Sequence, residues 1–484
     1  MEAKMKRIMV VGVFISLCLA IVAAPSHQKA CAEETTKAKN IILVMPDGMG
    51  FGSLSLLIDY SYLYKKKPLS INTVMEKGNT GYCVTSLLKY VVPEGCAGVT
   101  GVATGEKTTP VRLSVSPNGE RLQTIVEYAK ERGMKTGVVT TGRVSHYASS
   151  AFLAHAKNRK VENEIAEQET LSGVDVLLGG GLRHWIPQGK KVSDIATISK
   201  KLGADTLSKR EDDKNLIDQV KEKGYEVVFT AEDMASARGD KLIGLFSASA
   251  LPFSIDGRSQ EGLSSPSLSQ MTKKAIEVLK QDDAGFLLIV SDGLLSQLLH
   301  ENDPAGTLAQ LVEVDNAVKE AVDFARTNPD TLILVASPRD VGGVAFSAHE
   351  DKSLLIENDF GIPNDFAKLE LQKKSSNALF KDMGKEPSSA KIKKVISEST
   401  AYDLSGEEAM WVRVFPADEF FPKYMGYPYG ALGKILGKKT GIVWVSQYNT
   451  ALMTPIFGMG PGSQRVKGIK TTTDIFHIMK DAIK

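Results

Sequence analysis

The sequence predicts an α/β fold, a doubly wound, mostly parallel sheet with helices on both faces. Short, continuous apolar runs such as residues 40–46 are typical of strands that are buried on both faces. Amphipathic stretches with apolar residues at helical spacing separate these runs. Polar residues follow several of the runs, and ligands of such sheets bind at the carboxyl ends of the strands. Those residues are Asp47, Ser291 and the segment 337–339.

The elements are expected in the following order. The first strand lies at residues 40–46, where a Pro-Asp-Gly turn ends the apolar run. In the predicted helix 268–280, Met271, Ala275 and Val278 recur on one helix face. Further strands are predicted at residues 135–140, 174–178, 226–230, 242–246, 285–291, 331–337 and 452–458. Further helices are predicted at residues 123–131 and 304–325, with a last helix from Thr473.

We divide the chain into four parts. Residues 1–32 form a signal peptide, and residues 33–349 form the α/β core. Residues 350–440 break the strand–helix rhythm and are rich in Lys, Ser, Glu and aromatic residues, so we expect a crown-like insertion over one end of the sheet. Residues 441–484 return to the core.

The N-terminal segment has the features of a secretory signal. Basic residues within positions 4–7 precede an apolar run at residues 8–24, and small residues follow at positions 30–32. Cleavage is expected after Ala32; cleavage after Ala24 and an uncleaved membrane anchor are the alternatives. The expected protein is periplasmic or secreted, with no stable membrane span after cleavage.

The bulk composition is that of an ordinary globular protein, with 43% hydrophobic and 24% charged residues. The net charge of +2 gives no electrostatic reason to expect nucleic acid as a partner. Signal cleavage leaves Cys83 and Cys96, which in an exported protein either pair as a disulfide or remain small buried thiols.

The stretch Glu94-Gly-Cys-Ala-Gly-Val-Thr-Gly-Val, followed by Ala103-Thr-Gly-Glu-Lys-Thr108, resembles the nucleophile segment of alkaline phosphatases. In that family an acidic residue precedes the attacking serine. Here Glu94 holds the acidic place and Gly95 holds the serine place, and a glycine has no side chain that can attack phosphorus. The resemblance extends in order over most of the chain, through residues 40–50, 140–159, 175–181, 266–303, 335–343 and 441–462.

The resemblance implies a site with two zinc ions, a magnesium-like site and an arginine that grips the phosphoryl oxygens. Carried over residue by residue, it makes Asp47 and His300 remnant metal positions, with a further one at His146, a family position that is often His or Asp. It makes Arg159 the phosphate arginine, with Glu94 as its acidic neighbour.

Other positions depart from the family's pattern. Each zinc site keeps at most one strong ligand, whereas a catalytic zinc usually has about three protein ligands, so no cofactor is expected. Arg339 brings a guanidinium to the vacated zinc position, and we expect it to pair with Asp47. The substituted metal positions are Ser291, Ser296, Pro338, Arg339, Asn449 and Ala148.

Several other side chains are interpreted as structural. His155 and His349 are expected to be structural histidines, and Asp303 and Asp340 to be surface or loop carboxylates.

Two functions remain open from the sequence. The first is an exported member of the family with lost or strongly reduced phosphomonoesterase activity. It would have a structural role or bind phosphate or another small anion through Arg159, Arg339 and the helix amides near Gly95. The alternative is an active hydrolase with zinc and magnesium, in which Thr100, Thr104 or a metal-bound water attacks. The resemblance also implies a homodimer.

Overall fold

The computed structural model describes residues 36–258, 265–347, 363–414 and 430–484. The predicted signal peptide, residues 1–32, and His349 lie outside these residues. Within them, no helix combines the length and apolar character needed to cross a membrane.

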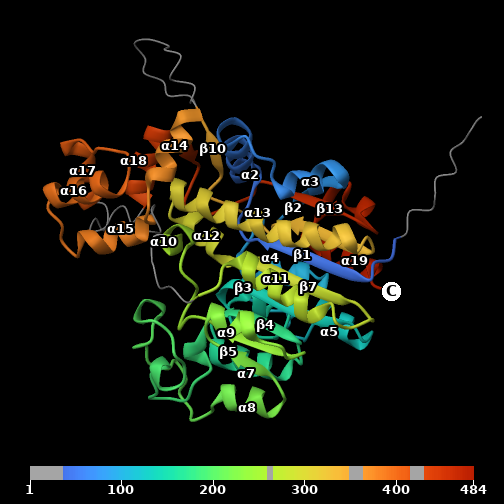
Figure 1. The fold of residues 1–484 in the computed structure, drawn as a ribbon. Helices are drawn as coiled ribbons and strands as arrows, with labels where there is room; N and C mark the ends of the chain where they lie inside the picture. Colours follow the sequence, from blue (N-terminus) through green and yellow to red (C-terminus); the bar gives the residue numbers. More distant parts are fainter. Residues whose placement is uncertain (1–35, 259–264, 348–362, 415–429) are drawn as a thin grey trace, which may run out of the picture. The chain divides into compact units, whose positions relative to one another are not determined.

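A ten-stranded sheet runs through the molecule in the order β14-β2-β13-β8-β1-β7-β3-β4-β6-β5 (Figure 1). Neighbouring strands are parallel except at β13, which is antiparallel to both β8 and β2. The mostly parallel sheet is therefore confirmed. Its strands are β1 (Asn40–Pro46), β2 (Asn79–Val84), β3 (Lys135–Arg143), β4 (Val176–Gly180), β5 (Glu226–Val228), β6 (Leu242–Leu245), β7 (Phe286–Asp292), β8 (Thr331–Ala336), β13 (Thr454–Met459) and β14 (Gly468–Thr471).

Two hydrophobic cores cover the two faces of this sheet. Ile41 and Leu43 of β1 point into one core and Ile42 and Val44 into the other, because successive strand residues alternate in direction. Helices of the first face are α4 (Gly95–Thr104), α5 (Ile125–Glu131), α6 (Tyr147–Ser150), α7 (Glu162–Leu171), α8 (Leu216–Glu222) and α19 (Thr472–Ala482). Helices of the second face are α2 (Phe51–Asp59), α3 (Ser70–Lys77), α9 (Ala231–Ser236), α10 (Ser254–Arg258), α11 (Leu268–Leu279), α12 (Gly293–His300) and α13 (Pro304–Thr327).

Within the segment predicted as an insertion, the described residues 363–414 and 430–440 are mainly helical and have a hydrophobic cluster of their own, which includes Leu379, Ile392 and Leu436. The strands on either side of it, β10 (Val344–Phe346) and β11 (Ile442–Trp444), pair antiparallel, so the chain leaves and returns at adjacent points. The helices of this segment are α14 (Pro363–Leu371), α15 (Ser376–Met383), α16 (Ser389–Ser399), α17 (Gly406–Val414) and α18 (Gly430–Thr440).

The sequence allowed a surface or a loop position for Asp303 and Asp340; the surface alternative is wrong, because both side chains are buried. Asp303 caps α13 by accepting the N–H of Gly306 at 2.8 Å, and it also accepts the N–H of Ser376 at 2.6 Å. Asp340 accepts the N–H of Gly343 at 3.2 Å. Each carboxylate thus satisfies backbone donors that would otherwise be buried without a partner.

Candidate functional site

A cavity of about 380 Å³ lies where β3, β7 and β8 end, beside the first residues of α4, α6 and α12. This is the carboxyl edge of the sheet, where the sequence places the site. We call this space the arginine cavity, because three arginines line it together with Glu94, Gly95, Gly142, His146, Tyr147, Ala250, Gly293, Leu294, Ser296, Gln297, His300 and Asn449. The three arginines are Arg143, Arg159 and Arg339.

Asp47 and Arg339 form a bidentate ion pair at the floor of the cavity. Nε of Arg339 donates to Oδ1 of Asp47 at 2.8 Å, and Nη2 donates to Oδ2 at 2.9 Å. Both side chains are buried, with 0% and 4% of their surface exposed. Burial alone would raise the pKa of Asp47, but the charge and hydrogen bonds of Arg339 outweigh it and hold that pKa below its usual value. The pairing expected from the sequence is present.

Two further residues complete the contacts of this pair. The Tyr147 hydroxyl donates to Oδ2 of Asp47 at 3.0 Å and accepts from Nη2 of Arg339 at 2.7 Å. Nη1 of Arg339 donates to Oδ1 of Asn449, whose amide donates to the carbonyl oxygen of Pro93 at 2.8 Å. A guanidinium has five N–H groups, so these contacts leave Arg339 only about one N–H for any ligand.

Helix α4 begins at Gly95, which packs against the side chain of Tyr147. A Cβ built on Gly95 would lie 2.6 Å from the Tyr147 hydroxyl and 2.7 Å from ring atom Cζ, closer than real Cβ contacts come. The side chain of Tyr147 therefore takes the space that any side chain at position 95 would need.

Glu94 joins the start of α4 to Arg159. One of its oxygens, Oε2, accepts the N–H of Ala97 at 3.0 Å as the helix N-cap and the N–H of Val111 at 3.1 Å. The other, Oε1, lies 3.3 Å from Nε of Arg159. Val111 has a φ of 65°, a rare conformation for a β-branched residue, and its carbonyl accepts the N–H of Arg159 at 3.0 Å. These contacts hold Arg159 at the cavity wall, with its guanidinium 4.8 Å from the centre of the Tyr147 ring.

The two histidines of the cavity are neutral at physiological pH. Burial and the charge of Arg143 lower the pKa of His146 to about 3. Burial and the charge of Arg339 lower the pKa of His300 to about 4. Nδ1 of His300 lies 2.6 Å from the carbonyl oxygen of Gln447, which fixes the ring. The cationic side chains of the cavity are therefore its three arginines.

The side-chain atoms around Asp47 do not form a set of zinc ligands. Both oxygens of Asp47 are engaged by Arg339 and Tyr147, and a guanidinium stands beside them. Among residues 36–258, 265–347, 363–414 and 430–484, no group of three or more His, Cys, Asp or Glu side chains is placed to hold a metal ion. Asp292, next to the substituted Ser291, instead caps α12 and accepts from Thr141 and Gln310 at 2.7 and 2.8 Å.

The two threonines that could replace a serine nucleophile are both occupied. Oγ1 of Thr100 donates to the carbonyl of Arg112 at 2.9 Å and accepts the N–H of Ser114 at 3.0 Å. Oγ1 of Thr104 donates to the carbonyl of Thr100 at 2.8 Å. Both side chains are buried, and neither lines the arginine cavity.

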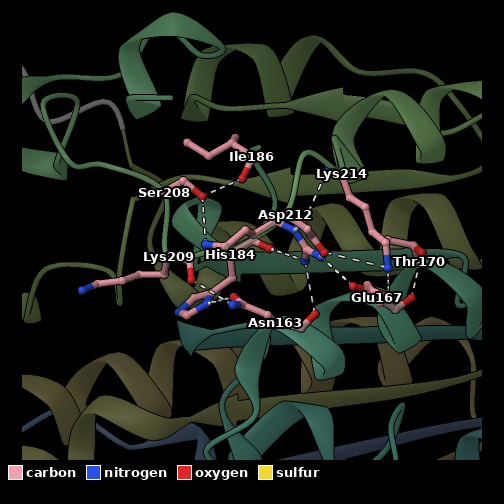
Figure 2. A network of polar contacts seen from close by, with 10 residues as sticks. Asn163, Glu167, Thr170, His184, Ile186, Ser208, Lys209, Asp212 and Lys214 are labelled. Carbon is pink, nitrogen blue, oxygen red and sulfur yellow. Dashed lines mark hydrogen bonds and ion pairs between the residues drawn. The ribbon is translucent and has the colours of Figure 1, made fainter. Parts of the chain in front are cut away.

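Arg143 is held by a polar network that the sequence did not reveal. Its Nε and Nη2 each donate to Glu162 at 2.7 Å, and burial, which would raise the pKa of Glu162, is outweighed by these contacts, so that pKa falls to about 2. Glu162 also lies 3.5 Å from His184, which is hydrogen-bonded to Asn163 at 2.8 Å. The backbone carbonyls of Asn163 and His184 accept from the buried Arg210, which also donates to Asp212 and Glu167. Figure 2 shows Asn163, His184, Asp212 and Glu167 gathered in this network.

Comparison with known proteins matches residues 38–484 to the family model described as alkaline phosphatase. The chain belongs to the alkaline phosphatase family. It is 26% identical to alkaline phosphatase 4 of Bacillus subtilis, over 99% of this chain and 97% of that protein. It is 27% identical to alkaline phosphatase 3 of the same organism, over 97% of this chain and 95% of that protein.

Solved structures of alkaline phosphatases share the fold. The enzyme from Thermus thermophilus superimposes with a TM-score of 0.81 at 24% identity, covering 95% of each chain. A variant of the enzyme from the Antarctic bacterium TAB5, with Mg bound, superimposes with a TM-score of 0.63 at 23% identity, covering 93% of this chain and 99% of the other. The alkaline phosphatase fold expected from the motifs is thus confirmed.

Within this alkaline phosphatase fold, the residues predicted for the site do come together. Asp47, Glu94, Arg159 and Arg339 are linked to one another or to Tyr147 by the contacts above, and His146 and His300 line the same cavity. Their roles toward a ligand stay predictions. Tyr147 was missed, because its part depends on α6 packing against the start of α4, which no local pattern reveals.

Proposed function

We propose that this member of the alkaline phosphatase family has lost phosphomonoesterase turnover and that its arginine cavity binds phosphate or another small anion. One observation supports the loss of turnover above all others. Tyr147 occupies the space of a side chain at Gly95, while Arg339 engages the carboxylate of Asp47. In the family pattern that the chain resembles, position 95 supplies the nucleophile, and the positions of Asp47 and Arg339 help to bind a metal cation. Phosphate-ester hydrolysis in that pattern uses both.

Anion binding is supported by the start of α4. In the described part of the chain, the N–H groups of Gly95 and Cys96 lack a protein acceptor, and the dipole of a ten-residue helix favours negative charge at this end. Arg159 borders the same space, and its Nε lies 3.3 Å from Glu94. A phosphate between these groups would accept from amides and guanidinium together.

We further propose that the protein is exported after signal cleavage at residue 32, to the periplasm or the medium, and that it forms a homodimer. The first proposal rests on the n-region, apolar run and small residues of the N-terminus. The second rests on the family resemblance alone, and sedimentation of the mature protein tests it.

Titration of the mature protein with inorganic phosphate by calorimetry tests the binding proposal. Phosphate should bind to the wild-type chain, and Arg159→Ala should weaken it about tenfold or more, as expected for a lost charge-assisted hydrogen bond. Arg326→Ala, at an exposed arginine near the end of α13, is the matched control and should bind as wild type. Absence of heat at millimolar phosphate rejects anion binding.

A metal count and an activity assay test the loss of turnover. The purified chain, incubated with zinc and magnesium and then dialysed, should retain less than one equivalent of either metal and should not hydrolyse a chromogenic phosphomonoester at alkaline pH. Stoichiometric zinc together with turnover abolished by chelation would establish the alternative, an active hydrolase.

A further inference from the structure

A second cavity, of about 520 Å³, adjoins the arginine cavity. The two share Ala250, Leu294 and Gln297 as lining residues, so they meet along one wall. The two cavities lie side by side from the start of α4 past α12 to α15, and we call the pair the groove. Ligand sites in proteins commonly have volumes of about 300–1,000 Å³, so each part has room for part of one organic molecule.

The second cavity has an apolar wall and a basic one. Leu251, Pro252 and Phe253 follow one another along the apolar wall, where Leu294 also contributes. Lys201, from the 3₁₀ turn Lys200–Leu202, and Lys381, from α15, provide the basic wall. An apolar strip with a few convergent polar groups is the usual composition of a small-molecule site.

The charges of the two cavities differ. In the arginine cavity each guanidinium faces a carboxylate: Arg143 faces Glu162, Arg159 faces Glu94 and Arg339 faces Asp47. Among the described residues that line the second cavity, the ammonium groups of Lys201 and Lys381 form no ion pair. Burial raises the pKa of Asp256, which lines the same cavity, and the charge of Lys381 opposes that rise. The one carboxylate that lines this cavity, Asp256, accepts from the backbone and hydroxyl of Ser375 at 2.7 and 2.8 Å. Positive charge is therefore in excess at the far end of the groove.

We propose that the groove binds an organic phosphate whose apolar body carries a second acidic group. The phosphate lies at the start of α4 beside Arg159, the body crosses Ala250 and Leu294, and the second acid meets Lys201 and Lys381. This inference rests on the proposed anion binding in the arginine cavity, and it adds the class of molecule that carries the anion.

Non-hydrolysable molecular rulers test the inference. A series of α,ω-alkane bisphosphonates of increasing length is titrated against the mature protein by calorimetry, next to n-alkyl monophosphonates of equal length and inorganic phosphate. One length of bisphosphonate should bind about tenfold or more tightly than its monophosphonate, as expected for added charge-assisted hydrogen bonds. The advantage should shrink as salt rises, because both lysines are exposed.

Variants assign the second anion to its site. Lys201→Ala with Lys381→Ala should remove the advantage of the bisphosphonate and leave the affinity for inorganic phosphate unchanged. Lys221→Ala, at an exposed lysine of α8 outside the groove, is the control and should change neither affinity. If no bisphosphonate gains over its monophosphonate, or if the gain survives in the double variant, the groove proposal is overturned. If inorganic phosphate and all phosphonates fail to bind, the proposed anion binding itself is rejected.

Discussion

The hydroxyl oxygen of Tyr147 lies 2.6 Å from the position that a Cβ of residue 95 would occupy. The same hydroxyl bridges Asp47 and Arg339. The absence of a side chain at one position and the ion pair at another are thus parts of one packed arrangement. We therefore expect a substitution at any of these four residues to disturb the contacts of the other three.

Restoring a serine by Gly95→Ser should not restore hydrolysis. The new Cβ would overlap the Tyr147 ring, and overpacking of this kind typically costs about 1–3 kcal/mol. We expect a lower free energy of unfolding in urea and no turnover of a chromogenic phosphomonoester.

A double-mutant cycle isolates the cause of this effect. Tyr147→Phe should not relieve the Gly95→Ser variant, because ring atoms Cζ and Cε2 lie 2.7 and 2.9 Å from the Cβ position. Tyr147→Ala should relieve it, so the two changes together should cost less than the sum of their separate costs. Strict additivity would show that Tyr147 and position 95 do not compete for space.

Breaking the buried ion pair should destabilise the protein strongly. Arg339→Ala leaves the carboxylate of Asp47 buried without its main partner, and losses of this kind are about 3–5 kcal/mol. Urea unfolding measures the loss. Asp47→Ala in the Arg339→Ala background should recover part of it, because the uncompensated charge is then removed. An unchanged melting temperature for Arg339→Ala would contradict the role given to the pair.

Glu169 should make stability fall as the pH rises. Among the described residues, neither oxygen of its buried carboxyl group has a hydrogen-bond partner. Burial, with the charge of Glu162, raises its pKa well above 4.5. Above the unfolded pKa of 4.5 the native state holds the proton more tightly than the unfolded state, so the stability contributed by protonated Glu169 is present at low pH. It is lost by up to about 1.4 kcal/mol per pH unit as pH rises toward the native pKa.

Glu169→Gln imitates the protonated carboxyl and should remove this slope. Urea unfolding at a series of pH values between 5 and 8 should therefore show the variant gaining on the wild type as pH rises. Glu164→Gln, an exposed glutamate of the same helix α7, is the matched control and should run parallel to the wild type. Parallel curves for both variants would mean that Glu169 is ionised or solvated in the native protein.

Cys83 and Cys96 should both be reduced thiols in the mature protein. The two are free and fully buried, and burial raises the pKa of Cys83 to about 12 and that of Cys96 well above its usual value. A disulfide-exchange reagent should therefore react with neither in the native state at pH 8 and with both in denaturant. Absence of reactive thiol in denaturant would instead establish the disulfide that the sequence left open.

The sequence predicted the centre of the sheet well. Strand β1 and its neighbours β7 and β8 are continuous apolar runs buried on both faces, and such runs are distinctive. At one edge, β14 and its neighbour β2 were not predicted, whereas β5 at the other edge falls within the strand expected at residues 226–230. Residues of β2 alternate between exposed and buried, and its pairing with the antiparallel β13 depends on contacts between distant parts of the chain.

The site was predicted only in part. The pairing of Asp47 with Arg339 was predicted from charge, because a guanidinium placed beside a carboxylate is attracted to it. The buried state of Asp303 did not follow, because its partner Ser376 comes from a helix far along the chain. The position of Tyr147 over Gly95 depends on how α6 meets α4, and one sequence contains no signal for such a meeting.

The pairing of β10 with β11 has an evolutionary consequence. Because the chain re-enters beside the point where it left, the helices between these strands can be exchanged or resized without disturbing the order of the large sheet. Lys381 belongs to that stretch, whereas Asp47 and Arg339 follow strands β1 and β8 of the large sheet. Substitutions in this segment can therefore change which ligands the groove binds without changing the Asp47–Arg339 ion pair.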